Sequence, residues 1–212
     1  MNPIRAVGLA LLLTSSLVRA GMEEDVARVR QEWERIKYQT AAREQEAALE
    51  ALGKDAEKVM MQYPKSAEPA IWHGIVEASY AGAKGGLGAL SHAKNARKSL
   101  EQALALNPNA LEGSAYTSLG SLYYQVPGWP IGFGDDKKAL ELLQKGLAAN
   151  PNGIDPNYFY GDFLYRSGDY TGAEQALRKA LQAPPREGRK LADDGRRTEV
   201  NALLEKIRDK KR

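Results

Sequence analysis

Residues 157–185 read NYFYGDFLYRSGDYTGAEQALRKALQAPP, and this stretch decides the fold. Gly168, Asp169 and Tyr170 are typical of a tight turn between two helices. Beyond the turn, small and apolar residues recur at the four- and three-residue spacing of one helix face: Ala173, Leu177 and Ala180. Before the turn, Gly161 marks a point where two helix axes can approach closely. The stretch therefore predicts a helix hairpin.

The same pattern occurs twice upstream, which makes the hairpin a repeat. In each copy two small residues flank a leucine and a proline closes the unit: Ala96, Leu100, Ala103 and Pro108, then Ala139, Leu143, Gly146 and Pro151. The first helices of these copies carry Gly74 and Gly120 at the place of Gly161. We therefore expect an all-α solenoid with three repeats in residues 67–185.

Two flanking regions complete the predicted fold. Residues 21–66 are rich in Ala, Glu and Arg and read as a degenerate helical repeat. Residues 186–212 read as a basic connector and a helix from about Asp193 to Lys210, with an apolar stripe of Val200, Leu203, Leu204 and Ile207. This helix is expected to cap the last repeat.

The first twenty residues have the layout of a secretory signal peptide. Arg5 precedes an apolar run, and Val18-Arg19-Ala20 suits cleavage after Ala20. An uncleaved N-terminal anchor helix is the alternative. The sequence contains no cysteine, so it offers neither a lipidation site nor a disulfide. We expect a soluble, periplasmic or secreted protein.

Composition and charge narrow the class of function. The chain has 212 residues, with 30 Lys and Arg against 27 Asp and Glu, a net charge of +3. Nucleic-acid-binding domains normally carry a strong basic excess, so no nucleic-acid partner is expected.

Two loops are longer than the 34-residue period from Pro151 to Pro185 requires. Residues 81–88 are rich in glycine, and residues 127–136 contain Trp129, Ile131 and Phe133 among prolines and glycines. These three apolar side chains either fold back over the helices or dock on another subunit or protein. Residues 82–88 lack the order of a phosphate-binding loop. Asp135 and Asp136 fit a helix N-terminus better than a cation site.

With these features, the chain resembles the tetratricopeptide repeat (TPR) superfamily. More narrowly, residues 60–190 resemble the T-component (TatT) family associated with periplasmic TRAP-type transporters, through Gly132-Phe133-Gly134-Asp135-Asp136, Lys138-Ala139-Leu140 and Asp155-Pro156-Asn157-Tyr158-Phe159-Tyr160-Gly161. The resemblance implies an α-helical scaffold with an internal channel or groove, trimeric in some members, that works beside a periplasmic substrate-binding protein. Members that are lipoproteins have a cysteine which this chain lacks, and membrane tethering does not carry over.

In TPR stacks the first helix of each pair lines the concave surface. The residues expected there run from apolar to polar along the chain: Ile71, Ile75, Ala78 and Ser79, then Thr117, Ser121, Tyr124 and Gln125, then Tyr158, Asp162, Tyr165 and Arg166. Tyrosines combine an apolar face with a hydroxyl group and suit peptides or amphipathic ligands. Packing between repeats is the alternative role for these side chains.

No catalytic or metal-binding motif is visible in the sequence. His73 lies beside the predicted crossing Gly74, and His92 lies in a charged helix start, so nothing in the sequence pairs them. We predict a binding scaffold rather than an enzyme, with no cofactor and no metal. The expected ligands are a partner protein, a small amphipathic molecule or both, and a homo-oligomer is compatible with the loops. The alternative is an envelope assembly protein that makes only protein contacts.

Overall fold

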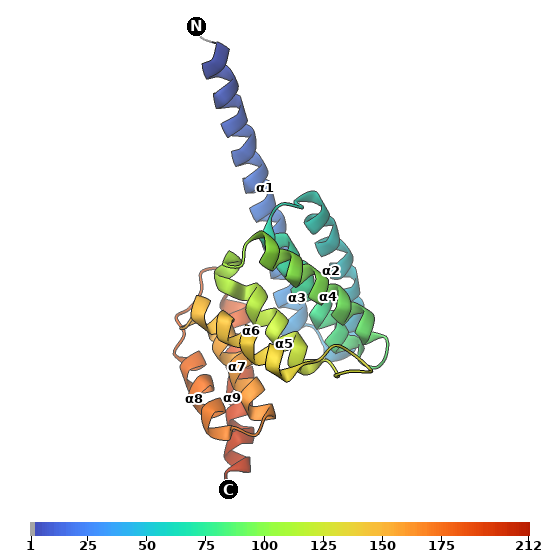
Figure 1. Cartoon of the computed structure of the whole chain (residues 1–212), viewed down its shortest axis with the longest axis vertical. Helices are drawn as coiled ribbons and strands as arrows, with labels where there is room; N and C mark the ends of the chain where they lie inside the picture. Colours follow the sequence, from blue (N-terminus) through green and yellow to red (C-terminus); the bar gives the residue numbers. More distant parts are fainter. Residues whose placement is uncertain (1–2) are drawn as a thin grey trace.

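A computed structural model describes residues 3–212, with side chains from Arg19 onward. This part of the chain is built from nine α-helices and one 3-10 helix: α1 (Pro3–Gln39), α2 (Ala42–Gln62), α3 (Ala67–Lys84), α4 (Ala89–Leu106), η1 (Ala110–Gly113), α5 (Ser114–Gln125), α6 (Asp136–Ala149), α7 (Ile154–Arg166), α8 (Tyr170–Leu181) and α9 (Lys190–Lys210). Consecutive helices pack as hairpins that stack side by side (Figure 1). The predicted all-α solenoid of helix pairs is confirmed.

A glycine in the first helix of each pair lies against a leucine of the second. A Cβ atom on Gly74 would lie 2.6 Å from Leu100 Cγ, and one on Gly161 would lie 2.8 Å from Leu177 Cγ. Gly120 meets the equivalent leucine of α6, Leu143, at 2.9 Å. Any larger residue would push the helices apart, so the crossing role predicted for these glycines is confirmed.

The second helix of each pair turns its small-residue stripe into the core. Along α4 and α8 every stripe residue is fully buried: Ala96, Leu100, Ala103, Ala173, Leu177 and Ala180. The N-termini of α6 and α8 are capped by aspartates. The Asp135 carboxylate accepts from the Lys138 amide at 3.0 Å, and Asp169 accepts from the Gly172 amide at 2.9 Å. The expectation that the acidic pair before Lys137 starts a helix is therefore correct.

The N-terminal region is helical, as predicted for residues 21–66. Its core contains Trp33, Ile36 and Leu52, which pack with Trp72 and Val76 of α3. Most of the predicted signal peptide, residues 1–20, lies outside the part whose side chains are described. Among the described helices, none combines the length and the apolar character that a membrane span requires.

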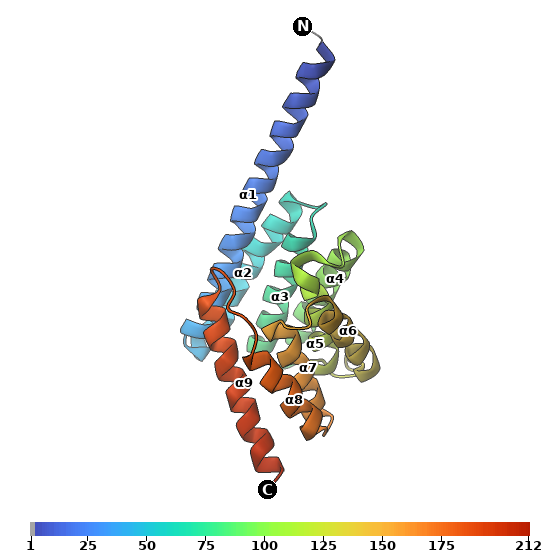
Figure 2. The ribbon, with the colours of Figure 1, turned by 90° about the vertical axis from the view of Figure 1, so that its left-hand side faces the viewer.

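The C-terminal helix α9 begins at Lys190, three residues before the predicted start, and covers the last repeat. Its Val200, Leu203 and Ile207 are buried in one cluster with Ile154 and Leu177. The same helix also lies beside the C-terminal part of α1, on the side of the molecule that faces the viewer in Figure 2. The solenoid therefore closes on itself, which the repeat pattern did not predict.

Prediction on the crossing glycines. We expect Gly74→Ala to lower the free energy of unfolding by about 1–3 kcal/mol, because the added methyl group overpacks Leu100. Gly82 is a matched control on the same helix, since a Cβ there meets no atom within 4 Å. Gly82→Ala should leave the stability unchanged or raise it by up to about 1 kcal/mol. Denaturant unfolding measures both, and equal effects of the two substitutions would contradict the crossing role.

Candidate functional site

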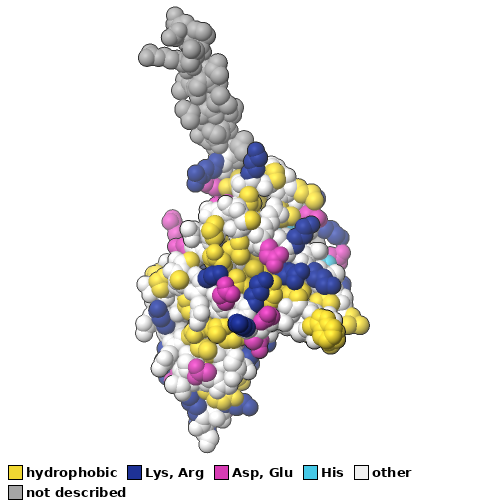
Figure 3. Space-filling view, viewed as in Figure 1, with side chains coloured by type: hydrophobic (Ala, Val, Ile, Leu, Met, Phe, Trp, Pro, Cys, Tyr) yellow, Lys and Arg dark blue, Asp and Glu magenta, His cyan; other side chains and the backbone are white. Residues whose placement is uncertain are grey.

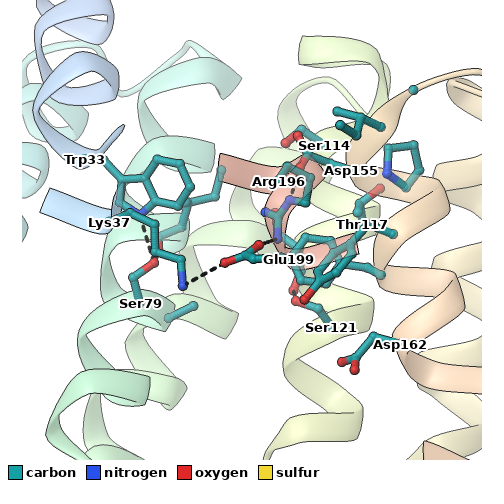
Figure 4. A pocket seen from close by; sticks show the side chains of 18 of the residues that line it. Trp33, Lys37, Ser79, Ser114, Thr117, Ser121, Asp155, Asp162, Arg196 and Glu199 are labelled. Carbon is teal, nitrogen blue, oxygen red and sulfur yellow. Dashed lines mark hydrogen bonds and ion pairs between the residues drawn. The ribbon is translucent and has the colours of Figure 1, made fainter. Parts of the chain in front are cut away.

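The closed solenoid surrounds a central cavity of about 1000 Å³. Its walls come mainly from α1, α3, α5, α7 and α9, with smaller contributions from α2, η1 and the α8–α9 connector, so both ends of the chain contribute (Figure 4). The residues that line it include Arg30, Trp33, Lys37, Trp72, Ile75, Ser79, Thr117, Ser121, Asp155, Tyr158, Phe159, Asp162, Arg166, Arg186, Arg189, Arg196 and Glu199. This volume lies at the upper end of the range of small-molecule sites, roughly 300–1000 Å³.

One wall of the central cavity is aromatic and apolar. Trp33 of α1 and Trp72 of α3 contact each other edge to face, with ring centroids 5.8 Å apart, and Ile75 lies beside them. The Trp33 indole donates a hydrogen bond of 2.8 Å to the Ser79 hydroxyl, which donates in turn to the Ile75 carbonyl oxygen. The indole is therefore held in one orientation with its polar group satisfied.

The opposite wall is charged and centres on Arg196 of α9. Its guanidinium donates to Asp155 at 2.8 Å and lies 4.4 Å and 4.7 Å from the ring centroids of Tyr158 and Phe159. Arg186 holds the other oxygen of Asp155 at 2.7 Å. Burial raises the pKa of Asp155, but Arg196 and Arg186 outweigh it and bring that pKa to about 2. The carboxylate is ionised at neutral pH.

Helix α9 is joined to α1 across the cavity by two ion pairs and one close contact. Arg189 pairs with Glu34, and both side chains are largely buried. Lys37 reaches Glu199 at 3.4 Å. At the crossing, Gly195 lies against the Tyr38 ring with no room for a Cβ atom. These contacts connect residues more than 150 positions apart in the sequence.

Arg30 differs from the paired cations of the cavity. Its Nε atom is buried and has no hydrogen-bond partner within the described part of the chain. Buried polar atoms in folded proteins are nearly always satisfied, so Arg30 is a cation of the cavity wall with one unused hydrogen-bond donor.

Nine of the twelve groove residues named from the sequence line the central cavity, among them Ile75, Thr117, Ser121, Tyr158, Asp162 and Arg166. Among them Arg166 donates to Asp162 at 3.1 Å, one helical turn away. Ala78, Ser79 and Gln125 complete the nine.

The other three groove residues lie outside the cavity, packed between helices. Ile71 is fully buried in the core between α3 and its neighbours. Tyr124 donates to Asp162 at 2.7 Å, and burial, together with this carboxylate, raises its pKa well above the usual value. Tyr165 packs against Tyr170 with ring centroids 5.7 Å apart. Ile71, Tyr124 and Tyr165 therefore have the alternative role considered from the sequence, which is packing between repeats.

Of the three apolar loop residues, one folds back over the helices and two remain exposed. Phe133 folds back against Tyr123, with ring centroids 5.5 Å apart, and the Arg97 guanidinium lies 4.4 Å from the centroid of the Phe133 ring. Trp129 and Ile131 remain exposed, at 90% and 60% of their surface.

Sequence reasoning missed the cavity residues of α1, α9 and η1. It considered only the first helices of the three clear repeats, so Arg30, Trp33 and Arg196 were not named. In η1, Leu111 and Glu112 reach the cavity from left-handed backbone conformations, with φ of 47° and 55°. No turn motif in the sequence predicts the left-handed conformation of Leu111 and Glu112. A usable signal exists in α9, where charged residues at positions 193, 196 and 199 recur on one helix face.

The two histidines do not line the cavity, and each is close to a polar side chain elsewhere. His73 is buried with Nδ1 2.7 Å from the Ser99 hydroxyl, and His92 Nδ1 lies 2.9 Å from Glu77. Over the described residues, no group of three or more His, Cys, Asp or Glu side chains is arranged to hold a metal ion.

Prediction on the closure. We expect Glu34→Gln to lower the free energy of unfolding by on the order of 3 kcal/mol, because it leaves the buried Arg189 charge without a counterion. Glu32 is the matched control on α1, since its ion pair with Arg35 is exposed to solvent. Glu32→Gln should have no measurable effect. Denaturant unfolding gives both values, and hydrogen exchange in α9 should rise only for Glu34→Gln. Protection of α9 that is unchanged would contradict the closure.

Prediction on pH. Burial lowers the pKa of His73 below its ordinary value of 6.5, against the opposing pull of Glu77 and Glu57. Below pH 6.5 the unfolded chain binds a proton at this residue that the folded chain does not bind, so the free energy of unfolding should fall as the pH falls. The substitution His73→Gln keeps a hydrogen-bond partner for Ser99 and should make the free energy of unfolding depend less on pH. The substitution His92→Gln should leave the pH dependence that is due to His73 unchanged. Unfolding curves between pH 7.5 and 5 measure the difference, and equal slopes for wild type and His73→Gln would refute it.

Comparison with known proteins supports the repeat over the C-terminal part. The crystal structure of MamA is 19% identical in sequence, with a TM-score of 0.46 over 78% of this chain and 90% of MamA. The structure of PilF from Pseudomonas aeruginosa is 17% identical, with a TM-score of 0.37 over 88% of this chain and 93% of PilF. No curated protein matches the chain significantly. The family model described as tetratricopeptide repeat matches residues 131–207, so the segment from the end of the α5–α6 loop into α9 is similar to tetratricopeptide repeats.

Proposed function

We propose that this chain is an exported binding scaffold whose central cavity takes one small amphipathic ligand with an anionic head group. Tetratricopeptide repeats are generally non-enzymatic scaffolds for protein interaction, and the match over residues 131–207 supports that class of role. The observation that supports a bound ligand is the cavity itself, which has a volume of about 1000 Å³ and an aromatic wall that faces a charged wall.

The arrangement of groups supports an amphipathic ligand over a purely polar one. Ile75 and the small exposed parts of Trp33 and Trp72 make this wall apolar, although both indoles are largely buried and Arg189 lies over the Trp72 ring. Arg30 lies on the same wall as Trp33, one helical turn away, so an acyl chain or ring against this wall would place a carboxylate or phosphate near its guanidinium. The other wall supports an anionic ligand less, because Arg186 and Arg196 already have acidic partners in Asp155, Asp193 and Glu199.

The narrower proposal is an accessory role in a periplasmic TRAP-type transport system, beside a substrate-binding protein. It rests on the sequence resemblance to the T-component family and on a cavity of the kind that this role requires. The second candidate, an envelope assembly protein, is favoured by one observation: Trp129 and Ile131 are exposed on the long loop rather than folded onto the helices. Export itself rests on the signal-like residues 1–20.

Prediction on ligand binding. We expect the intact purified protein to carry a co-purifying organic acid or lipid, detected by native mass spectrometry as a mass above that of the chain. Ser121→Trp should reduce the bound fraction at least ten-fold, because the indole would occupy the cavity that Ser121 lines. The control is Thr171→Trp, which adds the same side chain at the exposed start of α8.

Two outcomes separate the candidates. Loss of the ligand in Ser121→Trp alone, with the helical circular dichroism spectrum unchanged, supports the cavity as the binding site. An empty wild-type cavity together with a stoichiometric protein partner contradicts the ligand proposal and favours the assembly protein.

A further inference from the structure

The α3–α4 loop and the long α5–α6 loop lie side by side at one edge of the molecule. The α3–α4 loop covers only residues 85–88, because α3 continues to Lys84, so the long loop predicted for residues 81–88 is wrong in its first half; the α5–α6 loop covers residues 126–135. A Cβ atom on Gly132 of the α5–α6 loop would lie 3.4 Å from Cδ1 of Leu90, which follows the α3–α4 loop by two residues. The stacking of Arg97 on Phe133 ties the second loop to α4. The two loops therefore form one surface, at the lower right of Figure 1.

Large apolar side chains protrude from this surface. Leu87 is 87% exposed, and Trp129 and Ile131 are exposed as given above. We call these three residues the apolar edge. Figure 3 shows an apolar cluster at this corner, with Lys and Arg side chains on the face above it. The other two tryptophans, Trp33 and Trp72, are buried.

The backbone holds the second loop in place without help from the protruding side chains. The Gly134 amide donates to the Pro127 carbonyl oxygen at 2.9 Å, and the Gly132 amide donates to that of Gly128 at 3.0 Å. Val126 and Phe133 are the loop's apolar side chains that pack inward. Trp129 and Ile131 are thus presented to the outside by an ordered loop and contribute little to the core.

Positive charge is concentrated around the apolar edge. Residues 82–99 and 126–138 contain six Lys and Arg against two Asp, an excess of four, although the whole chain carries only +3. Lys84 pairs with Glu46 of α2, and Arg97 lies 3.9 Å from Glu101, one turn further along α4. With these two acids counted, the excess is still two positive charges. One of the two aspartates, Asp135, is engaged as the cap of α6.

The size and shape of the edge favour a lipid surface over a protein partner. A large aromatic side chain supplies about 150–250 Å² of contact area. Three side chains on loop tips therefore fall short of the roughly 800 Å² per partner that a standard protein interface buries. A protruding tryptophan, flanked by aliphatic tips and basic residues, has the composition that partitions into the head-group region of an anionic bilayer.

We infer that the apolar edge inserts into the interfacial region of an anionic lipid bilayer, with the lysines and arginines of residues 82–99 and 126–138 facing the lipid head groups. The chain is then a peripheral membrane-binding protein through this edge. The inference is independent of the ligand proposed for the central cavity, because none of the three edge residues lines that cavity.

The experiment follows Trp129 through its quenching, because the buried Trp33 and Trp72 are out of reach of bromine atoms on acyl chains and contribute an unquenched background. The full-length chain is mixed with vesicles of phosphatidylcholine containing 30% phosphatidylglycerol, with bromine atoms on the acyl chains as a fluorescence quencher. We expect quenching and a blue shift of Trp129 emission, and at least ten-fold weaker binding to pure phosphatidylcholine vesicles. Contact of another part of the chain with the vesicles would leave Trp129 unquenched.

Variants distinguish the edge from other surfaces. The double substitution Leu87→Ser/Ile131→Ser keeps the Trp129 probe and should abolish its quenching, whereas Lys137→Gln/Lys138→Gln should weaken binding to the anionic vesicles several-fold. Met61→Ser is the control, since Met61 is an exposed apolar residue on α2. Vesicle-bound protein with unquenched Trp129 would overturn the inference. So would self-association in light scattering that the double substitution abolishes, since a second copy would then cover the edge.

Discussion

The contact between a glycine on the first helix and a leucine on the second is the constraint on which the rest of the structure depends. Gly74, Gly120 and Gly161 each accept a leucine side chain where any Cβ atom would collide. Because the contact is the same in all three pairs, the pairs have one geometry and stack with a regular rotation. That rotation bends the solenoid enough for α9 to return to α1.

The return of α9 explains why the cavity has two chemically different walls. The aromatic wall is built by α1 and α3, near the start of the solenoid, and the charged wall by α7 and α9, near its end. Neither Trp33 nor Arg196 would face a ligand in an open stack. A buried ion pair such as Glu34–Arg189 adds little net stability compared with apolar packing, but it is intolerant of a wrong partner. The ion pair therefore suits a role in fixing the position of α9 relative to α1.

The sequence predicts the repeated parts well and the closure not at all. Spacings of three and four residues report which face of a helix is buried, so the stripes and crossing glycines could be read directly. The cavity residues of α3, α5 and α7 followed from those glycines. The contacts of Arg189 and Gly195 with α1 could not be found this way, because they depend on the summed rotation of all the pairs. Patterns within a single helix do not predict this summed rotation. Tyr124 and Tyr165 show a smaller limit, since a position near the groove does not decide whether a ring faces the groove or the next helix.

The closure also sets the number of repeats. An open solenoid can gain or lose a helix pair at either end, or in the middle, because each pair needs only its neighbours. Here an inserted pair would carry Gly195 away from Tyr38, and a deleted pair would drive α9 into α1. The chain thus behaves as a ring with a fixed circumference, in which loops such as residues 126–135 can lengthen freely while the count of helices cannot change.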